Sequence, residues 1–281
     1  MKHSTKKLST LIKLSTLVAL VAVPVFAYFI FNVSAGTVWN KTLNSNPDLQ
    51  DGLVGHWTFD GPDMISNVAD ISGQGNNGSL VGQTSTTTSP GKIGQALDFD
   101  GDDDYVNVGD SADLDITENI TMSTWVKLDK IDASEQGILS KTDSSSWGVY
   151  DLIYDGNNGK VFRVEISGLT DTQVYGSIVP TVDTWYNVVG TYDGSNLCVY
   201  VNGVQDDCDP STGTIDTNNL PLRLGVHRNL YMDGAVDDTR IYNRALSADE
   251  INRLYHLGAT THINKTLNSN PDLQDGLVGH W

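Results

Sequence analysis

Short apolar runs separated by turn residues constrain the fold of this chain more than any other feature. From Gly52 onward the runs include "LVGHWTF", "ITMSTWVKL", "TWYNVVGTY" and "LCVYVNG", and clusters such as "SGQGNNGS" and "DGNNG" lie between them. Alternation with period two is typical of half-buried strands, and many short strands joined by turns favour a sandwich or jelly roll. We therefore expect an all-β fold, an antiparallel β-sandwich.

The sequence also predicts one short C-terminal helix. Ser247 followed by Glu250 forms a capping box, and Gly258 is typical of a residue that ends a helix. Apolar residues recur between them at helical spacing, namely Ile251, Leu254 and Leu257. We expect this helix to close the folded module.

A long internal repeat sets the expected domain boundaries. The eighteen letters "NKTLNSNPDLQDGLVGHW" occur at residues 40–57 and again at 264–281, a period of 224 residues. Identity over this length indicates that a unit starts again. The expected organisation is a linker at 36–50, a module at 51–259, a second linker at 260–275 and the truncated start of a second repeat at 276–281.

Residues 1–35 have the layout of an export signal. Four lysines precede an apolar run from Leu17 to Phe31, and small residues follow at Ser34 and Ala35. We expect a signal peptide cleaved after Ala35, with a retained N-terminal anchor as the alternative. In both cases the module is secreted or on the cell surface.

The charge of the chain argues against one class of partner. The formal net charge is −18, with 35 acidic against 17 basic residues. Nucleic acid needs a surplus of lysine and arginine and is therefore not an expected partner. Aspartates in glycine-rich loops suit hard cations such as calcium, although an acidic surface can also simply keep a secreted protein soluble.

Two cysteines flank the hairpin signal "VYVNGVQDD". A two-residue turn at Asn202 and Gly203 would set Cys198 opposite Asp207, whereas a longer loop with a bulge would set Cys198 opposite Cys208. Export makes a disulfide between the two cysteines chemically feasible, and we expect one.

Several phrases in order carry a family resemblance. They include "GLVGHWTFDG", "GQALDFDGDDDYVNV", "TWYNVVGTYDGSNLCVYVNGV" and "GAVDDTRIYNRALSADEI", and together they cover most of residues 51–259. The module resembles the laminin G-like, concanavalin A-like jelly-roll domains of secreted proteins. The resemblance implies two stacked, curved sheets and a lectin-like or adhesive binding module.

The resemblance also implies one calcium ion near the rim of the sheets. Its ligands would be Asp60, oxygens around Asn77, and Asp237. Oxygen donors in this pattern suit calcium, but the same residues could instead cap turns. The acidic run "DFDGDDDYVNVGD" does not fit an EF-hand, because Asp103 stands where that loop needs glycine and Gly109 where it needs glutamate.

Catalytic signatures are absent from the sequence. Glycosidases need two carboxylates across the sugar, but no Glu-x-Asp-x-Glu cluster occurs, and no GxSxG motif marks a serine nucleophile. We therefore do not expect an enzyme.

A hairpin at 147–166 offers the best candidate for a ligand site. If its turn is centred on Asn157, Asp151 lies opposite Arg163, and this charged pair next to Trp147 would form a sugar-binding face. An ordinary cross-strand ion pair is the simpler alternative. The expected function is non-catalytic binding of a glycan or an extracellular protein by a calcium-stabilised tandem module. The alternatives are an architectural spacer repeat and an accessory domain of a polysaccharide-degrading enzyme.

Overall fold

The computed structural model describes residues 49–64, 67–82, 88–132, 134–142 and 148–268. The predicted signal peptide, nearly all of the first linker, the repeated start at 276–281 and Trp147 lie outside the described residues. No helix among the described residues is long and apolar enough to span a membrane.

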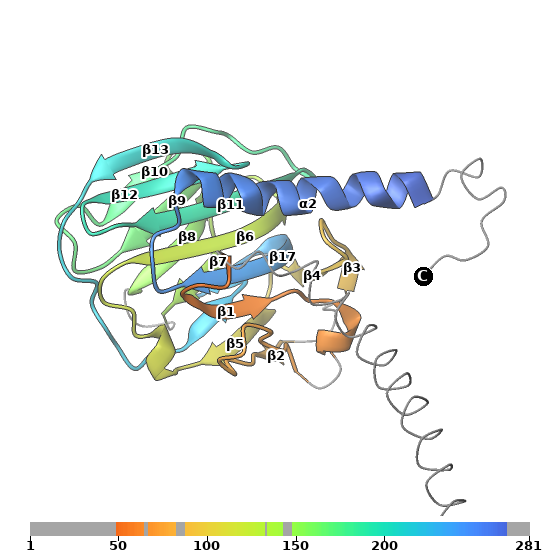
Figure 1. Ribbon diagram of the computed structural model, residues 1–281, viewed down its shortest axis with the longest axis horizontal. Helices are drawn as coiled ribbons and strands as arrows, with labels where there is room; N and C mark the ends of the chain where they lie inside the picture. The colour runs from red at the N-terminus through yellow and green to blue at the C-terminus, as the bar shows by residue number, and fades with distance from the viewer. Residues whose placement is uncertain (1–48, 65–66, 83–87, 133, 143–147, 269–281) are drawn as a thin grey trace, which may run out of the picture. The chain divides into compact units, whose positions relative to one another are not determined.

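From Asp51 onward the chain forms two large antiparallel sheets (Figure 1). The eight-stranded sheet has the spatial order β13-β12-β11-β6-β17-β4-β3, with β1 also paired to β17. Its strands are β1 (Leu53–Trp57), β3 (Thr88–Pro90), β4 (Gln95–Asp100), β6 (Ile120–Leu128), β11 (Trp185–Tyr192), β12 (Asn196–Val201), β13 (Val204–Pro210) and β17 (Asp233–Tyr242).

The seven-stranded sheet has the order β10-β9-β8-β7-β14-β5-β2. Its strands are β2 (Ser79–Val81), β5 (Tyr105–Gly109), β7 (Glu135–Lys141), β8 (Tyr150–Asp155), β9 (Val161–Ile166), β10 (Gln173–Tyr175) and β14 (Leu222–Leu224). The remaining elements are a small hairpin of β15 (Val226–His227) and β16 (Leu230–Tyr231), the 3-10 turns η2 (Gly61–Met64) and η3 (Ala112–Leu114), and the helix α2 (Ala248–Asn268).

The hydrophobic core lies between the two sheets, and alternation along the strands builds it. Strand β6 contributes every second residue except Thr124, and β8 does the same in the facing sheet. These core residues are Ile120, Met122, Val126 and Leu128 of β6 and Tyr150, Leu152 and Tyr154 of β8. The residues that alternate with these along each strand therefore point to the outer faces of the sheets. The expected β-sandwich is confirmed.

The disulfide forms because the β12–β13 hairpin combines a tight turn with a bulge. Val201 pairs with Val204 around Asn202 and Gly203, which have φ angles of 53° and 79°. The register then shifts by one residue beyond Tyr200, so that Cys198 pairs with Cys208 and the two are bonded. The expected disulfide is therefore present in the structure.

Helix α2 lies across the outer face of the eight-stranded sheet (Figure 1). The Tyr255 ring stacks on Trp125 of β6 with a centroid distance of 5.6 Å. The capping box is confirmed: the Ser247 amide and hydroxyl both donate to Glu250 Oε2, each at 2.8 Å.

The prediction that the helix ends at Gly258 is wrong, because α2 continues to Asn268 into the expected linker. Gly258 serves packing instead of termination. A Cβ atom there would lie 2.6 Å from atoms of the Trp125 ring, so only glycine lets the helix approach this tryptophan.

The register of β8 and β9 also differs from the expectation. Asp155 pairs with Val161, so Asp151 faces Glu165, while Arg163 faces Ile153. The turn spans 156–160 and is centred one residue later than expected, with Gly159 and Lys160 both at positive φ. The expected direct pairing of Asp151 with Arg163 is therefore wrong, although both side chains remain on the same face.

Candidate functional site

A buried polar cluster covers the outer face of the seven-stranded sheet at β7, β8 and β9. The alternation that sends Tyr150, Leu152 and Tyr154 into the core sends Asp151 and Asp155 to the opposite face. Asp151 and Asp155 are 0% exposed, which is unusual for carboxylates on the outside of a sheet. Buried carboxylates need hydrogen-bond donors or positively charged partners to offset their loss of hydration.

Arg163 supplies the positive charge of this cluster. Its Nη1 contacts Glu135 Oε1 at 3.2 Å and also pairs with Asp155, and its Nη2 lies 3.2 Å from Glu165 Oε2. The guanidinium also lies over the Tyr175 ring at 5.6 Å. Burial alone would lower the pKa of Arg163, but the carboxylates of Glu135, Asp155 and Glu165 outweigh it and raise that pKa.

A second group of contacts in the cluster links β7, β8 and β15 through Ser140, Asp151 and His227. The Ser140 hydroxyl of β7 donates to Asp151, and Ser140 Oγ lies 3.0 Å from Nδ1 of His227 in β15. That imidazole nitrogen is 3.6 Å from Asp151 Oδ1. Asp151 Oδ2 and His227 Nε2 are buried and have no hydrogen-bond partner among the described residues.

The cross-strand pair Asp151–Glu165 places two like charges opposite each other. Burial, followed by repulsion from Asp151, raises the pKa of Glu165. The sequence contained no adjacent acids to indicate this pair, because its members lie on different strands. The residues of the cluster that the sequence did not indicate are Glu135, Ser140 and Asp155.

A pocket with a volume of about 330 Å³ opens beside this cluster. Glu135 joins the two, because it lines the pocket and also accepts from Arg163. The other lining residues are Asp100, Gly101, Asp102, Lys130, Asp132, Ser134, Gln136, Asn229, Leu230, Tyr231 and Asp233. The pocket thus combines carboxylates, amides, one lysine and one aromatic ring.

The predicted metal ligands Asp60 and Asp237 both contact the segment from Gly91 to Gln95. The amide of Gln95 donates to Asp60 Oδ1 at 2.9 Å, and the amide of Ile93 donates to Asp237 Oδ2 at 2.7 Å. A Cβ at Gly94 would lie 2.1 Å from Asp60 Oδ1, and one at Gly91 would lie 2.5 Å from Asp237 Oδ2. Glycines therefore let this segment sit against both carboxylates.

Asp237 is fully buried, and its Oδ1 has no hydrogen-bond partner among the described residues. Burial raises its pKa to about 8, and the charges of Asp238 and Asp60 add to this effect. A buried carboxylate oxygen without a donor, near other carboxylates, is the environment that a cation would stabilise. The Asp237 carboxylate is thus suited to binding a cation.

Asn77 has a different role from these two aspartates. Its Oδ1 accepts from the Asp70 amide at 2.9 Å. Asp70 in turn accepts from the His56 amide and from Asn76. The Asn77 side chain thus holds the 70–77 loop against β1, and its oxygen already has a donor.

These features can be compared with known proteins. The family model described as the concanavalin A-like lectin/glucanases superfamily, of the laminin G type, matches residues 100–252, which is more than half of the chain. The chain belongs to this superfamily. No curated protein sequence matches it.

Solved structures with this superfamily fold include binding domains. Domain 4 of AbnA, a GH43 extracellular arabinanase from Geobacillus stearothermophilus solved in complex with arabinotriose, matches with a TM-score of 0.60 and 22% identity. The match covers 72% of this chain and 98% of that domain.

Toxin binding domains match more partially. The binding domain of Paraclostridial Mosquitocidal Protein 1 has a TM-score of 0.59 and 18% identity, covering 74% of this chain and 52% of that one. The botulinum neurotoxin serotype G binding domain has a TM-score of 0.57 and 15% identity, covering 74% and 52%. The chain thus spans about half the length of these toxin structures, and at such identities the likeness shows the fold alone.

Proposed function

We propose that this superfamily member is a non-catalytic extracellular module that binds neutral carbohydrate in the pocket beside the polar cluster. The observation that carries the proposal is the pocket itself, in which planar hydrogen-bonding groups and the Tyr231 ring meet at the edge of the cluster. Such a combination recognises sugar hydroxyls and the apolar face of a pyranose or furanose ring. The arabinotriose complex of the AbnA domain supports the class of ligand.

The charge of the pocket argues for neutral sugars. Asp100, Asp102, Asp132, Glu135 and Asp233 line it, with Lys130 as the one basic residue among its lining. An acidic glycan would bring another carboxylate into this field, and like charges at close range cost free energy. Hydroxyl groups can donate to the carboxylates without that cost.

Glycan binding by the full chain tests this proposal. On a glycan array we expect binding to neutral oligosaccharides and none to sialylated or uronate-containing ones. Glu135→Gln and Tyr231→Ala should weaken the dissociation constant about tenfold or more, a loss of at least about 1.4 kcal/mol. Glu118→Gln, which changes a glutamate outside this pocket, is the matched control. An absence of any glycan binding would contradict the proposal and favour a spacer repeat, and a preference for acidic glycans would contradict the neutral class.

The proposal that the module lacks catalytic activity rests on the burial of the cross-strand acid pair Asp151–Glu165. Asp151 is 0% and Glu165 8% exposed, and each already has a partner in the cluster. Glycoside hydrolysis needs both carboxylates at the scissile bond. Release of reducing sugar that Glu165→Gln abolishes would contradict this proposal.

A role as the accessory domain of a polysaccharide-degrading enzyme is the second candidate. It is favoured by the match to nearly the whole of one arabinanase domain, at 98% of its length. Under this alternative the module would direct a linked catalytic domain to its substrate. The sequence of the gene beyond the codon for Trp281 would test it.

We also propose that calcium binds between Asp60 and Asp237 and stabilises the module. Any ligand that binds only the folded state raises the free energy of unfolding, by about 2.7 kcal/mol at a ligand concentration of 100 times the dissociation constant, and therefore raises the melting temperature. Calcium should therefore raise the melting temperature of the full chain relative to chelator. The double variant Asp60→Ala, Asp237→Asn should show a smaller shift, and Asp249→Asn on α2 should not. A shift of equal size in the double variant would exclude this site.

A further inference from the structure

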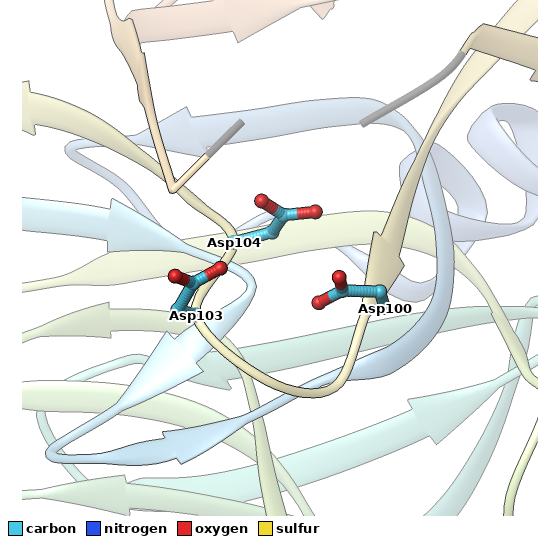
Figure 2. Close-up of side chains that lie close together, drawn as sticks. All are labelled: Asp100, Asp103 and Asp104. Atoms are coloured by element: carbon cyan, nitrogen blue, oxygen red, sulfur yellow. The ribbon is translucent and has the colours of Figure 1, made fainter. Parts of the chain in front are cut away.

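Three aspartates converge in the loop that connects β4 to β5. Asp100 is the last residue of β4, and Asp103 and Asp104 immediately precede β5. One carboxylate oxygen from each lies within 4.8 Å of the other two. Figure 2 shows the three side chains directed toward a shared space between the end of β4 and the start of β5.

Asp104 distinguishes this group from an ordinary acidic surface. It is 1% exposed, and neither of its carboxylate oxygens has a hydrogen-bond partner among the described residues. Among the residues that the structure describes, no lysine, arginine or histidine forms an ion pair with Asp103 or Asp104. A buried carboxylate without donor or counter-charge is strongly unfavourable unless a cation compensates it.

Gly82 lies against the carbonyl oxygen of Asp103 and a carboxylate oxygen of Asp104. A Cβ atom at Gly82, which has a φ of 94°, would lie 2.4 Å from the Asp103 carbonyl oxygen and 2.7 Å from Asp104 Oδ1. A side chain there would therefore fill the space beside both oxygens. The absence of a side chain at Gly82, the residue that follows β2, leaves the space beside both oxygens open.

We infer that Asp100, Asp103 and Asp104 form a second calcium site, separate from the Asp60–Asp237 pair. The donors are all oxygens, as hard cations require, and the cluster contains no thiolate or imidazole that would favour zinc. The site lies where the β4–β5 loop contacts Gly82, the residue that follows β2. Asp100 also lines the pocket described above.

Calcium stoichiometry tests this inference directly. By equilibrium dialysis of the full chain with calcium alone, Asp104→Asn should bind one ion fewer than the wild type. Asp102→Asn removes the same charge from the same loop outside the three-residue cluster, and should leave the stoichiometry unchanged. The double variant Asp60→Ala, Asp237→Asn should still bind one ion, and adding Asp104→Asn should abolish that binding. The two proposed sites are therefore tested separately.

Thermal unfolding gives a second readout that a merely structural role of Asp104 would not produce. Without calcium, Asp104→Asn should melt at a higher temperature than the wild type, because the amide removes an uncompensated buried charge. In excess calcium the order should reverse. If Asp104→Asn fails to fold, the exposed variant Asp103→Asn should weaken calcium affinity by tenfold or more. Unchanged stoichiometry in both variants, or a melting order that does not depend on calcium, overturns the site.

Discussion

At the residue scale, this structure uses glycine where two groups must approach closely. Gly82 and Gly94 each lie against an aspartate carboxylate, and Gly258 lies against the Trp125 ring. The sequence alone favours a turn or a helix end at each glycine, because those are its commonest roles. At Gly258 that interpretation is wrong, since the reason for glycine lies on another element.

Gly258→Ala should destabilise the fold despite the better helix propensity of alanine. The added methyl group would overlap the Trp125 ring, which is 1% exposed and cannot move freely. Overpacking of this kind costs about 1–3 kcal/mol, whereas the helix gains about 1 kcal/mol from alanine. Urea unfolding should therefore show a net loss. Combining Gly258→Ala with Trp125→Leu should recover part of it, and strictly additive losses would contradict the proposed contact.

At the element scale, the start of α2 could be predicted and its end could not. The Ser247–Glu250 capping box is a local signal, and Arg244 reinforces it through a contact of 2.7 Å between Nη2 and Glu250 Oε1. The helix continues past Gly258 to Asn268, and Gly258 packs against the Trp125 ring of β6. Likewise, the turn of the β8–β9 hairpin differs by one residue from its expected centre, and this changes the partner of Asp151.

Glu250 should make the stability of the helix start dependent on pH. The hydrogen bond from Arg244, followed by those from Ser247, lowers the pKa of Glu250 to about 2 from 4.5. Because the folded-state pKa is lowered, its contribution is fully present above pH 4.5 and is lost as the pH falls toward 2. NMR titration should report this low pKa, and Arg244→Gln should raise it. Glu250→Gln should cost about 1 kcal/mol at pH 7 and almost nothing at pH 2. An equal cost at both pH values would contradict the assignment.

At the scale of the whole molecule, both candidate sites are assembled from residues far apart in the chain. Asp60 and Asp237 meet across one segment, and His227 of the β15–β16 hairpin reaches Asp151 of β8. The family resemblance indicated Asp60 and Asp237 as candidates, and the hairpin pattern indicated Asp151 and Arg163. The sequence did not identify Glu135 and Ser140 as their neighbours, because the strand order that brings β7 beside β8 is not a local property.

The sequence by itself determined the all-β class, the sandwich, the Cys198–Cys208 hairpin and the helix start, because alternation, turn residues and caps act over a few neighbouring positions. Only the tertiary structure decided which carboxylates share a site. It buried Asp104 without a donor among the described residues beside Asp100 and Asp103, set Glu165 opposite Asp151, and packed α2 against Trp125. Burial and the pairing of distant strands depend on the packing of the whole sandwich, and the local pattern of residues does not contain that information.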